Sequence, residues 1–93
     1  MKEKMIENKL NKAVVKRGGL SLKFVSPGLS GVPDRILLFH GGEMVFCEVK
    51  APGKKPRPLQ EHRIEQLRAM GFRVYVVDSE EQIGEMIREI QSS

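Results

Sequence analysis

Two acidic residues and a lysine stand near the ends of two apolar segments of the chain. Asp34 follows a proline before the first segment, and Glu48 and Lys50 lie two residues apart at the end of the second. Carboxylate oxygens suit Mg²⁺ or Mn²⁺, and the carbonyl of Val49 with water molecules would complete an octahedral site. Such an ion polarises a phosphate and lowers the pKa of a bound water, while Lys50 positions that water or holds a phosphate oxygen. The chemistry indicated is metal-dependent hydrolysis of a phosphodiester.

A purely structural interpretation fits the same residues. Charges beside an apolar strand cost on the order of several kcal/mol unless they are paired or bound to an ion. An ion pair of Lys50 with Asp34 or Glu48 would meet that requirement, and Pro33-Asp34 is an ordinary turn sequence. The pattern D-x13-E-x-K is short and recurs by chance, so the spacing alone leaves both interpretations open.

The hydrophobic pattern predicts seven elements that would position these residues. Apolar residues recur at helical spacing in three of them, and they alternate or cluster in the four strands. Leu20 and Leu22 alternate with polar residues as in a half-buried strand, and Met70 is expected to point inward from its helix. Ser79 and Gln82 have the spacing of a capping box at the start of the last helix. A loop with two prolines and two glycines, residues 26–33, precedes Asp34, and a basic loop with three prolines, residues 51–58, follows Lys50. In order, the elements are expected at residues 5–16 (helix), 20–24, 35–40 and 43–50 (strands), 59–70 (helix), 72–77 (strand) and after Ser79 (helix).

This order predicts an α/β sandwich, with a mixed sheet of about four strands and helices against its faces. Gly71 permits a strand–helix–strand crossover, so the fourth strand is expected to run parallel to the third. The 93 residues, 1–93, are expected to form one domain. A core this small gains from a partner subunit. The apolar stripe of the last helix packs on its own sheet or serves such an interface; it consists of Ile83, Met86, Ile87 and Ile90.

The register of the hairpin around Gly41-Gly42 is a test of the site. A strict two-residue loop would place Asp34 opposite Val49, and therefore on the other face of the sheet from Glu48 and Lys50. A three-residue loop or one bulge shifts the register by one residue and brings Asp34 to the same face. We predict that shift, or else that Asp34 lies just before the regular strand and is free to turn.

Composition restricts the partners of the protein. The net charge of +4 favours a polyanion, while only five aromatic residues and no tryptophan argue against a base-stacking platform for single strands. One cysteine cannot form an internal disulfide. We find no signal-peptide core and no apolar stretch long enough to cross a bilayer, which predicts a soluble protein of a reducing compartment with no membrane partner.

Three sequence motifs together resemble a known family of nucleases. Gly31-Val-Pro-Asp34, then Glu48-Val-Lys50, then a helix opening with Gln60, resemble the PD-(D/E)XK nucleases, and more closely the VRR-NUC domain in its stand-alone, phage-like form. The resemblance extends from Glu7 to about Val77. It implies a restriction-endonuclease-like αβββαβα sandwich, Mg²⁺ or Mn²⁺ as cofactor, and the cytoplasm of a phage or bacterial host. It further implies structure-selective cutting of DNA by a homodimer that resolves four-way (Holliday) junctions.

The resemblance assigns roles to five residues of this sequence. Asp34, Glu48 and Lys50 correspond to the family's acidic residues and lysine. Its first-helix acid corresponds to Glu7, which would reach the metal directly or through water; an ordinary solvated helix charge is the alternative, and Glu3 is a weaker competitor. Its helix-start glutamine corresponds to Gln60, which would orient Lys50, a water or a phosphate, or would simply bond the backbone at the helix start.

Two loops carry candidate DNA contacts. Lys54, Lys55 and Arg57 follow the catalytic strand directly and could hold a phosphate backbone near the metal, although a solvated surface loop explains them equally well. Ser26 and Ser30 precede Asp34 and could bond a phosphate, while turn-forming serines are commoner.

Three other functions remain open at this point. A related nuclease could cut flap or plain duplex DNA instead of junctions. A basic DNA-binding module without catalysis is a second reading, although carboxylates beside a phosphate bring a pure binder no benefit. A structural or protein-interaction domain is a third reading, and it predicts no salt-dependent affinity for DNA.

Overall fold

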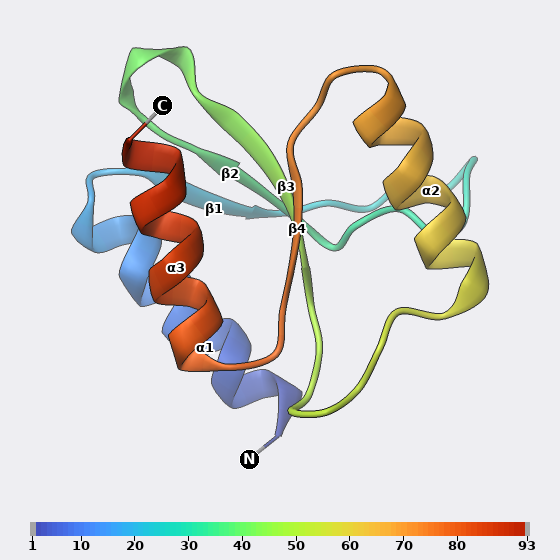
Figure 1. The fold of residues 1–93 in the computed structure, drawn as a ribbon, viewed down its shortest axis with the longest axis horizontal. Helices are drawn as coiled ribbons and strands as arrows, with labels where there is room; N and C mark the ends of the chain where they lie inside the picture. The colour runs from blue at the N-terminus through green and yellow to red at the C-terminus, as the bar shows by residue number, and fades with distance from the viewer. Residues whose placement is uncertain (1, 93) are drawn as a thin grey trace.

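A four-stranded mixed sheet, covered by helices on both faces, forms the protein in this computed structural model (Figure 1). The structure describes residues 2–92. Its elements are α1 (Glu3–Lys16), β1 (Leu20–Lys23), β2 (Arg35–Leu38), a 3₁₀ turn (His40–Gly42), β3 (Met44–Val49), α2 (Pro58–Ala69), β4 (Val74–Val77) and α3 (Glu80–Gln91). The predicted order and fold class are therefore confirmed, with element boundaries displaced by at most two residues.

The strands lie in the sheet in the order in which they occur in the chain. β1 and β2 pair antiparallel, as do β2 and β3, whereas β3 and β4 are parallel. The parallel pairing confirms the predicted crossover through α2. Gly71 ends α2 with a φ of 96°, a left-handed conformation that glycine adopts without a Cβ penalty.

The face of the sheet under α1 and α3 carries the main hydrophobic core. Figure 1 shows these two helices side by side on one side of the sheet, with α2 on the other. Inward residues of β3 alternate in the expected way, and Val45, Cys47 and Val49 face this core. The remaining fully buried members come mostly from the two helices: Ile6, Leu10, Val14, Ile83, Met86, Ile87 and Ile90. The stripe of α3 is thus used inside this chain and does not form an exposed interface.

The other face, under α2, has a smaller apolar cluster built on Phe46, Ile64 and Val74. Phe46 packs between Phe24 and Phe72, each with its ring centre 5.8 Å away. Because this cluster occupies only part of the face, the strand ends beside it remain open to polar side chains. Glu48 is the one charged residue among residues 2–92 that is classed as buried, and it lies here, at the end of β3.

Two expectations about burial are wrong. We expected the edge strand β1 to be half-buried through Leu20 and Leu22, but these side chains are 58% and 43% exposed. Met70 was expected to point inward from α2 and is 68% exposed. In both cases the local apolar pattern identified the element correctly, but it did not predict which of its apolar side chains the rest of the fold covers.

The start of α3 shows a variation on the predicted cap. The Ser79 hydroxyl accepts a hydrogen bond from the Gln82 N–H at 3.2 Å, as expected for an N-cap. The Gln82 side chain, however, accepts from the N–H of Asp78 at 2.8 Å instead of from that of Ser79. None of the helices within residues 2–92 has the length and apolar character that crossing a membrane requires.

Candidate active site

The hairpin has the shifted register, which brings Asp34 beside Glu48. Arg35 pairs with Cys47, and the hairpin closes where the Phe39 N–H donates to the Glu43 carbonyl at 2.9 Å, leaving three residues in the loop. Continued by one residue, this register sets Asp34 opposite Glu48, so both side chains belong to the α2 face. The predicted one-residue shift is confirmed, and Asp34 also lies just before the regular strand.

Three donors surround the carboxylate of Glu48, which is only 3% exposed. Its Oε1 accepts a hydrogen bond from the backbone N–H of Asp34 at 3.1 Å. Its Oε2 accepts from the Gln60 amide at 3.0 Å and lies 3.1 Å from Nζ of Lys50. A charged side chain is stable in a buried position only when hydrogen bonds and an opposite charge compensate for the water it has lost. The Glu48–Lys50 ion pair that was weighed as a structural alternative is therefore present, inside the candidate site.

The carboxylate of Asp34 accepts one backbone hydrogen bond and lies in an unfavourable electrostatic environment. Its Oδ1 accepts from the N–H of Val49 at 3.2 Å. Burial, followed by the negative charge of Glu48, raises the pKa of Asp34 to about 6. The negative charges of Asp34 and Glu48 lie close together, and among residues 2–92 Lys50 is the one cation paired with Glu48. A bound divalent cation would stabilise both ionised carboxylates.

Gln60 bonds the backbone at the helix start, as the structural alternative expected, and its side chain also reaches the candidate site. Its Oε1 accepts from the N–H of Arg57 at 2.9 Å, which caps the start of α2, and its Nε2 donates to Glu48. Pro58, at the first position of α2, favours the helix start at this point. One amide thus fixes the helix start to the end of β3, and its partner there is Glu48, not Lys50.

The loop before Asp34 is clamped by α2. Gly31 has a φ of 84°, and a Cβ built on it would lie 2.8 Å from Cγ of Leu59. Nε of Arg63 donates to the carbonyl of Ser30 at 2.8 Å. These contacts give a physical reason for the glycine of the Gly31-Val-Pro-Asp34 motif, because no larger residue fits between the loop and the helix.

Arg63 was not singled out from the sequence. It lies three residues after Gln60, a spacing that places two side chains on one side of a helix, and this spacing was the signal that could have identified it.

Glu7 is not brought to the other candidate residues by any contact that the structure shows. Its Oε1 lies 3.3 Å from Arg35 and 3.2 Å from Lys4. Burial acts to raise the pKa of Glu7, but hydrogen bonds from Lys4 and Arg35 outweigh it, and the pKa lies below its usual value. The acid whose charge acts on Asp34 from α1 is Glu3. A metal-ligating role for Glu7, direct or through water, stays a prediction.

The candidate DNA-binding residues lie on both loops that flank the site. Lys54, Lys55 and Arg57 are exposed, and they follow Lys50 as expected. Ser30 is exposed and uses its carbonyl to hold Arg63. The carbonyl of Ser26 accepts from the Leu29 N–H at 3.2 Å, which is turn chemistry. Contacts of these five residues with DNA stay predictions.

The donor set fits a hard divalent ion that retains much of its water. Within residues 2–92, no three acidic, histidine or cysteine side chains gather closely enough to hold a metal by themselves. Asp34 and Glu48 therefore provide two protein carboxylates, and the adjacent Val49 carbonyl is the candidate third ligand. Mg²⁺ sites commonly use one or two carboxylates and several waters. Cys47 does not compete as a ligand, because burial raises the pKa of its thiol far above the usual value.

Comparisons with known proteins agree with this geometry. Residues 1–81 match the family model described as the VRR-NUC domain. A phage protein with the name "Putative nuclease p44", from Acyrthosiphon pisum secondary endosymbiont phage 1, is 46% identical over 81 residues, which cover 87% of each chain. A solved structure described as a VRR_NUC domain superposes with a TM-score of 0.87 at 31% identity, covering 92% of this chain and 94% of the other.

Proposed function

This chain belongs to the VRR-NUC domain family of nucleases, and from that premise we propose that it is a Mg²⁺- or Mn²⁺-dependent endonuclease that cuts branched DNA. The proposed substrate is a four-way junction, cut by a homodimer in the cytoplasm of a bacterial host. The observation that carries the proposal is the shifted hairpin register, which sets Asp34 opposite Glu48, with Lys50 and Gln60 on the same carboxylate oxygen.

The chain's own residues divide the work of hydrolysis. Asp34, Glu48 and the Val49 carbonyl would hold the divalent ion, which supplies Lewis-acid polarisation of a phosphate oxygen and a lowered pKa for a water when it is bound. Lys50, with Nζ 3.1 Å from Glu48, would orient the attacking water or hold a phosphate oxygen. Gln60 keeps Glu48 in one orientation, so the carboxylate needs little rearrangement to act.

The basic residues Lys54, Lys55 and Arg57 would bind the DNA backbone. They lie on the loop that starts at the end of β3, so the phosphates they hold would pass beside the carboxylates. Two copies related by a two-fold axis would address the two symmetry-related strands of a junction. Sedimentation at several protein concentrations tests this assembly, and a monomer at every concentration would refute the dimer while leaving catalysis open.

The decisive experiment uses a synthetic four-way junction and a duplex of matched sequence, each with Mg²⁺, Mn²⁺, Ca²⁺ or EDTA. We expect cutting of the junction with Mg²⁺ or Mn²⁺ and none with EDTA. Cutting of flap or duplex DNA instead would assign a different selectivity. Metal-independent cutting, or no cutting of any DNA, would refute the proposed mechanism.

A further inference from the structure

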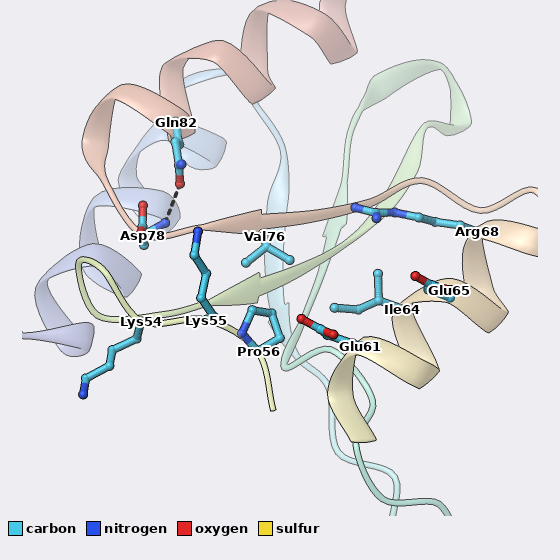
Figure 2. A pocket seen from close by; sticks show the side chains of 10 residues that line it. All are labelled: Lys54, Lys55, Pro56, Glu61, Ile64, Glu65, Arg68, Val76, Asp78 and Gln82. Atoms are coloured by element: carbon cyan, nitrogen blue, oxygen red, sulfur yellow. Dashed lines mark hydrogen bonds between the residues drawn. The ribbon is translucent and has the colours of Figure 1, made fainter. Parts of the chain in front are cut away.

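A hollow of about 360 Å³ lies between α2, β4 and the loop that follows β3 (Figure 2). Val76 lines it, and in the parallel pairing of β3 and β4 this residue is the direct partner of Glu48. Neighbouring strands are about 4.8 Å apart, so the hollow adjoins the catalytic carboxylate on one face of the sheet. Glu61, which also lines it, directly follows Gln60.

The lining combines an apolar centre with a polar rim. Figure 2 shows the Pro56 ring and the side chains of Val76 and Ile64 toward the middle, with the Glu61 carboxylate beside Pro56. Lys54 points outward, away from the other side chains. The polar residues of the lining are Lys54, Lys55, Glu61, Glu65, Arg68, Asp78 and Gln82.

Four charged side chains of the rim make no ion pair or side-chain hydrogen bond in the described part of the chain: Lys54, Lys55, Glu61 and Glu65. The two carboxylates would repel a phosphate inside the hollow, whereas they can accept hydrogen bonds from amino and imino groups. The outward lysine suits a phosphate outside it. A nucleobase has this distribution, with apolar faces, donors and acceptors at its edge, and a phosphate one sugar away.

The hollow is formed in advance, since its loop is tied to the rest of the molecule. Oδ2 of Asp78 accepts from the N–H of Gly53 at 3.1 Å, and the N–H of Asp78 donates to Gln82 at 2.8 Å. Prolines at positions 52, 56 and 58 restrict the same loop. A ligand therefore pays little ordering entropy on binding.

From these observations we infer that the hollow binds one unpaired nucleotide of the DNA substrate, base inward, beside Glu48. This inference rests on the proposed nuclease function and names a source of its selectivity. A base inside a continuous duplex must be unstacked and unpaired to enter, whereas a branch supplies an unpaired nucleotide at small cost.

Binding of branched DNA in Ca²⁺, without turnover, tests the inference. One DNA carries a single unpaired adenine nucleotide at the branch, and its match carries an abasic nucleotide there. We expect the wild-type protein to bind the abasic DNA about tenfold more weakly than the adenine DNA, since an abasic nucleotide has no base to bury in the hollow. The double variant Glu61→Ala/Glu65→Ala and the hollow-filling variant Glu65→Trp should reduce that ratio toward one.

The control is Glu81→Ala/Glu85→Ala, which removes two negative charges from exposed positions of α3 outside the hollow. It should keep the tenfold ratio, because any general gain in DNA affinity cancels between the two DNAs. All substituted positions are exposed on helices, so folding should survive, and circular dichroism checks this. If the wild type binds the adenine and abasic DNAs equally well in Ca²⁺ and cuts DNA in Mg²⁺, the inference about the hollow is wrong and the nuclease proposal stands. Absence of DNA binding by the wild type overturns the nuclease proposal, and the hollow with it.

Discussion

The two faces of one sheet serve different purposes in this protein. Along β3, residues Val45, Cys47 and Val49 enter a closed apolar core under α1 and α3. The intervening Phe46 and Glu48 face α2, where a small cluster gives way to paired charges. Because successive side chains of β3 point to opposite faces, the same strand contributes apolar residues to the core and charged residues to the candidate site.

The comparison shows why the site can contain a buried carboxylate at all. The α1–α3 face contains twelve buried members of the main core, whereas the α2 face contains three. Since most of the apolar burial is secured on one face, the other can accommodate Glu48, and Asp34 with its raised pKa, without loss of the fold. Substitutions on the two faces should therefore have separable consequences.

The largest effect is expected from Glu48→Ala on the α2 face. If Glu48 ligates the proposed metal ion, its loss should reduce DNA cutting by at least about a thousandfold, because such an ion contributes several kcal/mol of transition-state stabilisation. DNA binding should persist or become stronger, since a negative charge beside the phosphates is removed. Initial rates and binding in Ca²⁺ measure the two quantities; unchanged cutting would contradict the assignment. Glu85→Ala is the matched control on an exposed helix surface.

The opposite pattern is expected from Ile87→Ala on the α1–α3 face. This side chain is 3% exposed, so its truncation should lower the free energy of unfolding by about 3 kcal/mol and Tm by about 15 °C. The cutting rate per folded molecule should not change at a temperature well below Tm. If the rate falls as steeply as it does in Glu48→Ala, the two faces are not separable.

Gly31→Ala should damage both properties moderately. The added Cβ would lie 2.8 Å from Cγ of Leu59, and residues with a Cβ rarely adopt a φ of 84°. The loop before Asp34 must therefore move. We expect a loss of about 1–3 kcal/mol in stability and about tenfold or more in cutting, as small displacements of catalytic groups are costly.

Gly41→Ala separates backbone strain from displacement of the site. Gly41 has the same φ of 84° with no atom within 4 Å of an added Cβ, and it lies at the far end of the hairpin. Gly41→Ala should lower the free energy of unfolding without lowering the cutting rate. Equal losses of cutting rate in the two variants would show that contact with α2 does not position Asp34.

The smallest effect concerns the pH dependence of the metal-free protein. With its pKa raised from 3.8 to about 6, Asp34 binds a proton more tightly in the folded state than in the unfolded state. The free energy of unfolding should therefore fall as pH rises from about 4 to about 6, and Asp34→Asn should remove this contribution. Chemical denaturation across this pH range measures it. Metal affinity should increase over the same range as Asp34 ionises. If the side-chain carboxyl carbon of Asp34, followed by NMR, titrates near pH 3.8, the buried environment described for it is contradicted.

The fold was predictable because its signals are local. Apolar spacing of 3.6 and 2 residues, with glycines and prolines at the boundaries, identified every helix and strand. Burial was less predictable: Leu20, Leu22 and Met70 follow apolar patterns but remain exposed, since burial depends on packing between segments that are distant in the sequence.

The sequence predicted that Asp34, Glu48, Lys50 and Gln60 would lie together, which the structure shows, but it did not predict their contacts. Alternation requires Glu48 and Lys50 to share a face, and the family motifs add Asp34 and Gln60. The partner of Gln60, the pairing of Glu7 with Arg35 and the clamp by Arg63 depend on side chains that meet across the fold.

The sequence by itself determined the elements, the hairpin and the charged end of β3, because chain geometry allows only a helix or a strand to satisfy each periodic pattern. The tertiary structure decided which of two registers the hairpin adopts, and so whether Asp34 meets Glu48 or faces away. A shift of one residue leaves the local pattern almost unaltered but reverses the face of every side chain, and only packing of the whole sheet against its helices selects between the two.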